Sequence, residues 1–199
     1  MSIINVGSTA YLHFANIFLR ADKDAEMRIP VAIVADLDKR EYEREPKKDE
    51  NGDIQKNGKK IIYEYIKQPS ISYCQEREAK RKSIIDGDRF VKAFVSNKWT
   101  LEYCLLKSQL LSEIFKTSLK AVHSDTFDDA CTTEEKWEEG LARIMLSKSI
   151  KKTEIANQIA TLVEIANLND YKEEDAISYL INAIKHACSE KPQKTDDNT

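Results

Sequence analysis

Apolar residues near the start of the chain follow two different spacings. The segment "SIINVGSTAYLHFANIFLR" opens with a short β-branched run, breaks at Gly7 and Ser8, and continues with apolar residues near helical spacing. After Pro30, "VAIVAD" is continuously apolar, which is typical of a strand covered on both faces in a parallel sheet. The pattern therefore predicts a right-handed βαβ unit at the start of the chain.

The middle of the chain alternates between polar and apolar stretches. Residues 40–60 are dense in charge and turn formers, so we expect a surface excursion, in the form of a hairpin with "IIYEYI" as its returning strand. The segment "SYCQEREAKRKSIIDGDRF" predicts a helix up to Gly87, and "FVKAFVS" predicts a strand that ends at Ser96. The segment "WTLEYCLLKSQLLSEIFKTSLKAV" has an apolar stripe at helical spacing and predicts one long helix.

The last third of the chain has only helical patterns. After a polar break at "HSDTFDDACTTEEK", we expect helices over 133–147, 152–167 and 173–188 and a disordered polar tail. The fold class predicted from these patterns is α/β, a Rossmann-like parallel sheet with a helical C-terminal segment. The predicted domains are an α/β core over 1–125 with the surface insertion 40–68, the helical segment 126–189, and the tail 190–199.

Composition and charge restrict the classes of function. With 199 residues, 41% of them apolar, the chain can bury one ordinary core. Because no apolar run could span a bilayer and the first residues lack the features of a secretory signal, we expect a cytoplasmic protein without a membrane partner. The four cysteines are scattered without a CxxC pair, which indicates neither a zinc site nor a disulfide framework. A net charge of -3 argues against binding nucleic acid through the overall charge of the chain, so binding would need a local basic patch or a bound metal.

Two aspartates follow the apolar run after Pro30. Asp36 and Asp38 would lie at the carboxyl end of a parallel strand, where such sheets bind ligands, and strand alternation would point both side chains the same way. Two close carboxylates repel each other unless a cation compensates, and oxygen ligands suit Mg²⁺ or Mn²⁺. The alternative is a pair of solvated loop acids that cap the next turn.

Four segments in order carry a resemblance to a known family. They are "INVGSTAYLHFANIFLR", "IPVAIVADLD", "WTLEYCLL" and "KKTEIANQIA". Together they resemble the later part of the Toprim domain of OLD-family (overcoming lysogenization defect) endonucleases, a group that includes the nuclease subunit of Gabija antiphage systems. The resemblance implies a Toprim-like fold and a metal-dependent DNA endonuclease with two Mg²⁺ or Mn²⁺ ions, normally fused behind an ABC-type ATPase domain.

The resemblance also assigns roles to particular residues. Asp36 and Asp38 match the DxD motif of the family, Glu102 matches its later acidic residue, and Lys152 matches the lysine of its K-x-E-hydrophobic-A segment. The resemblance therefore implies that Asp36, Asp38 and Glu102 bind metal and that Asp36 and Lys152 are catalytic. Lys152 should then approach the carboxylates, whereas Lys151 should face away.

The chain departs from the family pattern at its start. It begins at what would be the second Toprim strand, without the VEG-type motif whose glutamates bind metal, and it has no Walker A pattern. We therefore expect a sheet truncated at its N-terminal strand and a chain that is a C-terminal portion, a split subunit or a remnant. The expected partners are DNA and an ABC-type ATPase domain or chain that supplies the missing part, with a second copy of the chain as a further candidate. With few carboxylates, the isolated chain is expected to bind metal weakly and to cut DNA poorly.

Two other classes of function fit parts of the sequence. A haloacid-dehalogenase-like phosphatase also has DxD after an apolar strand, and "AFVS" and Lys152 could fill its later roles, although Arg40 stands where that family has Thr or Val. A non-catalytic remnant or interaction module would use the helical C-terminal part to pack against a partner chain. Local chemistry also offers simpler roles for single residues: Glu102 as an exposed acid in the first turn of a helix, and Lys152 as a solvated helix flank.

Overall fold

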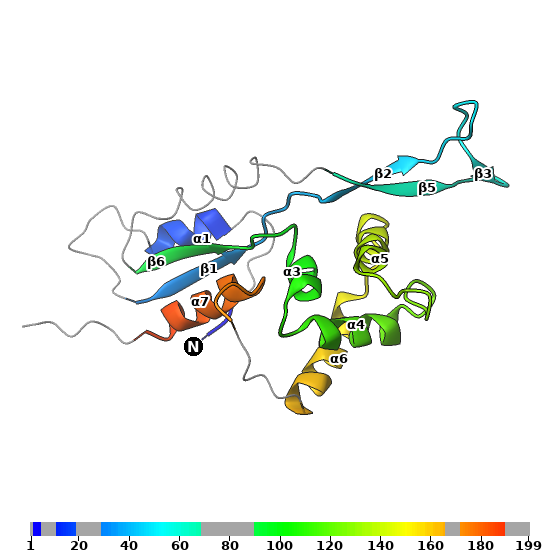
Figure 1. Cartoon of the computed structure of the whole chain (residues 1–199). Coiled ribbons are helices and arrows are strands. Elements are labelled where there is room, and N and C mark those ends of the chain that lie inside the picture. The colour runs from blue at the N-terminus through cyan, green and yellow to red at the C-terminus, as the bar shows by residue number, and fades with distance from the viewer. Residues whose placement is uncertain (1, 5–10, 19–28, 69–89, 166–171, 190–199) are drawn as a thin grey trace, which may run out of the picture. The chain divides into compact units, whose positions relative to one another are not determined.

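The computed structural model describes residues 2–4, 11–18, 29–68, 90–165 and 172–189 (Figure 1). Within these ranges the chain is mixed α/β with a small parallel sheet. It divides into two compact units. Unit 1 comprises Met1–Leu37, Ser72–Asn97 and Ile177–Thr199, and unit 2 comprises Asp38–Ile71 and Lys98–Ala176.

Unit 1 contains the parallel sheet. Strand β1 (Val31–Ala35) pairs in parallel with β6 (Val91–Val95), and the helices α1 (Tyr11–Phe18) and α7 (Ser178–Ala187) contact β1. Figure 1 shows the two helices on opposite faces of the strand pair. The pairing confirms the parallel sheet that the continuous apolar run predicts. The run also predicts a strand covered on both faces, but β1 is only partly buried, and Val34 is exposed.

Unit 2 contains a hairpin and a group of helices. Strand β2 (Tyr42–Pro46) pairs antiparallel with β5 (Tyr63–Lys67), and the short strands β3 (Lys56–Asn57) and β4 (Lys60–Ile61) lie at the far end of this ribbon. The predicted hairpin with its returning strand is thereby confirmed. The helices are α3 (Leu101–Lys107), α4 (Ser112–Val122), α5 (Glu134–Leu146) and α6 (Lys152–Ile165).

One core holds unit 2 together. Aromatic and aliphatic side chains from the ribbon and from all four helices form it, including Tyr42, Tyr103, Phe115, Trp137 and Ile155. Burial of large apolar side chains contributes about 1.5–3 kcal/mol each relative to exposure. The core therefore fixes the base of the ribbon and the starts of α3 and α6 within one unit.

Three predicted elements differ in the structure. The single helix predicted from Trp99 is wrong: it is divided into α3 and α4, because Ser108 Oγ accepts the N–H groups of Leu110 and Leu111 and Asp175 Oδ2 also accepts that of Leu110. These bonds compete with the helical pattern. Residues 2–4 form no strand, and α7 begins five residues later than 173.

Some predicted elements lie outside the described residues. They are the rest of the N-terminal strand, the helix that ends near Gly87, and the tail from residue 190. Among the helices that the structure does describe, none is long and apolar enough to cross a membrane.

Gly140 of α5 provides a test of the packing in unit 2. A Cβ atom at this position would lie 2.6 Å from Phe127 Cε1, and the Phe127 ring stacks on Trp137 at a centroid distance of 5.0 Å. In an open helix Gly→Ala stabilises by up to about 1 kcal/mol, but overpacking costs about 1–3 kcal/mol. We therefore expect Gly140→Ala to lower the free energy of unfolding by about 1 kcal/mol in urea titration.

The control for this substitution is a double-mutant cycle with Phe127→Leu. The smaller side chain removes the ring carbon nearest to the new methyl group, so Gly140→Ala should cost less in the Phe127→Leu background. A stabilising effect of Gly140→Ala in the otherwise unchanged chain would contradict the packing described here.

Candidate metal and phosphate site

Asp36 lies at the carboxyl end of the parallel sheet, in unit 1. It directly follows β1, and Ser96 directly follows β6, so the two residues come at the same edge of the parallel pair. Ser96 donates its N–H to Ala35 O at 3.0 Å, and its Oγ accepts the N–H of Leu37 at 2.8 Å. The position of Asp36 at a strand end agrees with the sequence pattern, and this edge is where parallel sheets bind ligands.

Asp38 belongs to unit 2 and has a different backbone conformation. Strand β1 ends at Ala35, and Asp38 has a φ of 54°, in the left-handed region that Asp tolerates better than most residues. Its N–H donates to Trp99 O at 3.0 Å. Strand alternation therefore does not set the relative directions of the two aspartates, and the prediction that it points both side chains the same way is wrong.

Glu102 lies in the first turn of α3. Thr100 is the N-cap of this helix, and its hydroxyl accepts the N–H of Tyr103. The side chain of Glu102 is only 11% exposed, so the alternative of an exposed first-turn acid is wrong. Its Oε2 atom is buried and forms no hydrogen bond to any residue that the structure describes. A buried polar atom without a partner is costly, which suits an oxygen that binds a cation.

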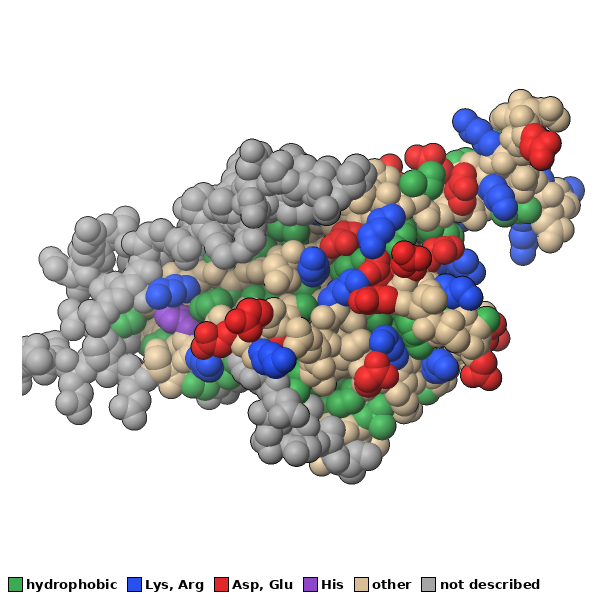
Figure 2. Space-filling view, in the orientation of Figure 1, with side chains coloured by type: hydrophobic (Ala, Val, Ile, Leu, Met, Phe, Trp, Pro, Cys, Tyr) green, Lys and Arg blue, Asp and Glu red, His purple; other side chains and the backbone are tan. Residues whose placement is uncertain are grey.

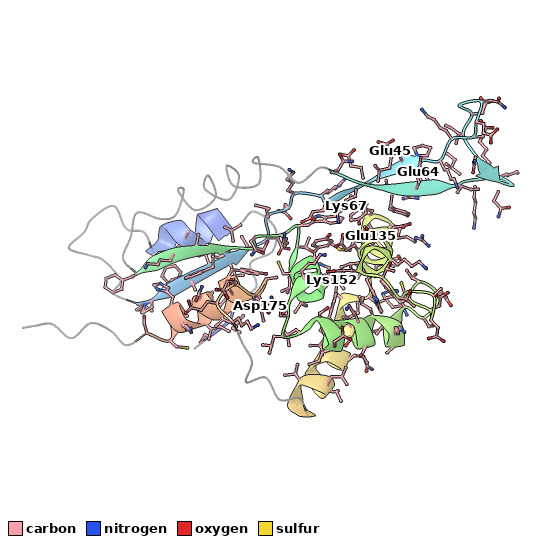
Figure 3. All side chains as sticks on the ribbon, viewed as in Figure 1. Glu45, Glu64, Lys67, Glu135, Lys152 and Asp175 are labelled. Carbon is pink, nitrogen blue, oxygen red and sulfur yellow. The ribbon has the colours of Figure 1, made fainter. Side chains whose placement is uncertain are left out.

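Lys152, the first residue of α6, contacts this glutamate. Its Nζ lies 2.7 Å from Glu102 Oε1, although the two residues are fifty positions apart in the sequence. Figure 3 labels Lys152 beside α3, the helix that carries Glu102. Lys151 Nζ instead pairs with the exposed Glu154 at 3.3 Å. The two neighbouring lysines thus have separate partners, as expected if only Lys152 approaches an acid of the site.

His123 holds the chain immediately before Lys152. Its Nε2 accepts the N–H of Lys151 at 3.2 Å, which requires the neutral imidazole. Burial and the nearby Lys151 lower the pKa of His123, and Glu154 opposes that effect. His123 follows α4, which packs against α6, so this bond fixes the start of α6. No sequence pattern singled out this residue.

A buried charge network surrounds Glu138, a residue that no sequence pattern singled out. This carboxylate accepts from Tyr42 Oη at 3.1 Å and Lys67 Nζ at 2.6 Å, and it forms an ion pair with Lys107. Burial alone would raise the pKa of Glu138, but the hydrogen bonds from Lys107 and Lys67 outweigh it and lower the pKa to about 2. The available signal was an acid within the buried stripe of α5, beside Leu141 and Ala142.

The candidate ligands suit a divalent metal because of their donor atoms. Asp36, Asp38 and Glu102 offer carboxylate oxygens, the ligands that Mg²⁺ and Mn²⁺ prefer, and Glu102 contributes a buried oxygen without a hydrogen bond. No group of three or more Asp, Glu, His or Cys side chains gathers around one point in the described parts of the chain. Within unit 2, the hydrogen bond from Asp38 N–H to Trp99 O joins Asp38 to the residues just before α3, and α3 carries Glu102.

Comparisons with protein-family models, with curated proteins and with solved structures found no match to this chain.

Proposed function

We propose that the chain is a metal-dependent DNA endonuclease domain of the Toprim type, from an OLD-like ATP-dependent nuclease that acts in DNA processing or phage defence. The observation that carries the proposal is the ion pair between Lys152 and the buried Glu102. The order of motifs in the resembling family assigns both residues to one metal site. The side chains of these two residues, fifty positions apart in the sequence, lie within 2.7 Å of each other. The parallel strands with Asp36 at their carboxyl end support the same proposal.

Each residue has a distinct role in this proposal. Asp36, Asp38 and Glu102 would hold Mg²⁺ or Mn²⁺, which would supply Lewis acidity when bound. The Lys152 ammonium neutralises Glu102 in the free protein and offsets the negative charge that develops on a phosphate during cleavage. A divalent cation held by these carboxylates would offset their negative charge, which is how a protein with a net charge of -3 would bind the phosphates of DNA. The proposal includes an ABC-type ATPase domain or chain that supplies the missing N-terminal part, and it places the protein in the cytoplasm.

Metal binding tests this proposal without relying on catalytic activity. In Mn²⁺ titrations followed by calorimetry, Asp36→Asn, Asp38→Asn and Glu102→Gln are each expected to weaken binding by at least about tenfold, because each removes a charged oxygen ligand. Asp125→Asn, a change at an exposed acid, is the matched control and should bind like the wild type. Equal Mn²⁺ affinity for all five proteins would contradict the metal site and leave the non-catalytic module as the better proposal.

A second candidate is a phosphohydrolase that uses Asp36 as a nucleophile. The observation in its favour is that Asp36 and Ser96 follow two adjacent parallel strands at the same edge, as a haloacid-dehalogenase-like site requires. Against it, Ser96 is buried and its Oγ already accepts the Leu37 N–H. Turnover of p-nitrophenyl phosphate with a trapped aspartyl-phosphate at Asp36, and no cleavage of plasmid DNA, would favour this candidate over the nuclease.

A further inference from the structure

The far end of the β2–β5 ribbon carries two turns of opposite charge. We call residues 47–62, beyond Pro46 and Tyr63, the arm tip (Figure 1). The turn over residues 49–53 has three acids and no base, and the turn over residues 56–60 has three lysines and no acid. All six charged side chains are exposed: Asp49, Glu50, Asp53, Lys56, Lys59 and Lys60. Figure 2 shows acidic and basic side chains gathered on this end of the ribbon.

Backbone and side-chain hydrogen bonds hold both turns in defined conformations. In the acidic turn, the Asp49 carboxylate accepts the N–H groups of Asn51 and Asp53 at 2.9 Å each. In the basic turn, Gly58 has a φ of 60°, which is typical of the tight turns that join two strands, and β3 pairs with β4 on either side of it. The two sets of charges are therefore presented by ordered backbone, which lowers the entropy cost of binding.

Three exposed isoleucines accompany these turns. Ile54 lies between them in the sequence, and Ile61 and Ile62 follow the basic turn; their exposed fractions are 45%, 38% and 38%. Hydrogen bonds from Lys47 N to Ile62 O and from Gln55 N to Lys47 O join the segments on which they lie. An apolar group with charged groups beside it is the usual composition of a protein–protein contact surface.

We propose that the arm tip is a self-association surface, on which the acidic turn of one copy of this chain binds the basic turn of a second copy. The charges of the two turns are equal in number and opposite in sign, so a twofold axis would place each turn against its complement in both directions. The isoleucines of the two copies would then be covered together. This inference goes beyond the proposed nuclease and does not depend on it.

DNA is the competing occupant. Lys47 and Lys48 precede the acidic turn, so the arm tip as a whole has five lysines and three acids, and its net charge is +2. The acidic turn would repel phosphates, however, and DNA would leave the isoleucines exposed. A second copy of the chain satisfies both turns and the apolar side chains, which is why we favour it.

Reciprocal charge reversal tests the proposal by sedimentation equilibrium on the full chain. The wild type is expected to self-associate with a Kd of about 10–100 μM, as small transient interfaces do. Lys59→Glu/Lys60→Glu and Glu50→Lys/Asp53→Lys should each weaken self-association at least tenfold, and raising the salt concentration should weaken that of the wild type. Asp49 is left unchanged because its carboxylate orders the acidic turn.

Recombining the charges separates a specific contact from damage to the fold. An equimolar mixture of the two double variants should form a heterodimer more tightly than either variant self-associates, because one pair of unchanged turns with net charges of -3 and +3 meets and the two altered turns carry net charges of +1 and -1. The chain that carries all four substitutions should also self-associate more tightly than either double variant. A wild type that stays monomeric, or variants that do not recover on mixing, would overturn the proposal. Loss of DNA binding on Lys59→Glu/Lys60→Glu, together with tighter DNA binding on Glu50→Lys/Asp53→Lys and no self-association, would show that the arm tip binds DNA instead.

Discussion

Glu138→Ala is expected to lower the free energy of unfolding by about 3 kcal/mol, measured by urea titration at neutral pH. Glu138 is 2% exposed and joins the ribbon to the helices of unit 2 through Tyr42, Lys67 and Lys107. Removing one member of a buried ion pair costs about 3–5 kcal/mol. The lower end of that range applies, because Lys67 is half exposed and Lys107 keeps its contact with Glu134 at 2.7 Å.

The neighbouring residue on α5 is the matched control. Glu139 is about half exposed and pairs with Arg143 at 3.2 Å one helical turn further on. Exposed pairs of this kind contribute about 0.3–0.5 kcal/mol, so Glu139→Ala should have a small effect on stability. Similar losses for the two variants would show that the charges around Glu138 do not stabilise the fold as described.

Acid should weaken the fold through the same carboxylate. The pKa of Glu138 falls from its ordinary value of 4.5 to about 2 in the folded chain, so its stabilising contribution is complete above pH 4.5 and is lost as the pH falls towards 2. The difference corresponds to at most about 3 kcal/mol. Over that range Glu138→Gln should lose less stability than the wild type, and parallel curves for the two proteins would exclude Glu138 as the source.

In a protein complemented with the N-terminal part that carries the missing glutamates, Lys152→Ala is expected to reduce Mn²⁺-dependent plasmid cleavage by at least about 100-fold in single-turnover assays, because it removes a positive charge where negative charge develops on the phosphate. Lys151→Ala should change the rate by less than about twofold. Lys151 and its partner Glu154 are both exposed, so water can replace the ion pair between them. The two lysines are adjacent and of the same type, so each controls for general effects of charge loss.

Two further measurements distinguish catalysis from simple structural support. Lys152→Ala should leave Mn²⁺ affinity unchanged or higher, because the ammonium no longer competes with the metal for Glu102. Lys152→Arg can restore the ion pair but presents a planar guanidinium, so it should recover stability without full activity. If the alanine variants of Lys151 and Lys152 cut DNA equally well, the role proposed for Lys152 is wrong.

The fold could be predicted where local patterns determine the structure. The apolar run before Asp36 predicted a strand of a parallel sheet, and the charged segment with its β-branched return predicted the hairpin. The break between α3 and α4 could not be predicted from periodicity, because the apolar stripe continues through it and the hydrogen bonds of Ser108 and Asp175 decide the outcome. The absence of a strand at residues 2–4 likewise shows that a β-branched run alone does not make a strand.

The site residues were found by a different route. Spacing alone could not pair Glu102 with Lys152 across fifty residues, and the order of motifs in a resembling family suggested it. No motif existed for Glu138, whose partners Lys67 and Lys107 come from a strand and another helix. Nor did any pattern mark His123, because its bond to the Lys151 N–H depends on how α4 packs against α6.

The interleaving of the two units decides how the chain can be dissected. The backbone passes between the units after Leu37, Ile71, Asn97 and Ala176, so one proteolytic cut at any of these points leaves them covalently joined. Trimming to residues 38–176 would keep every part of unit 2, including Asp38, Glu102 and Lys152, but would remove β1 and α7 and leave β6 without its partner strand. Functions of the two units are therefore better separated by point substitutions than by shortening the chain.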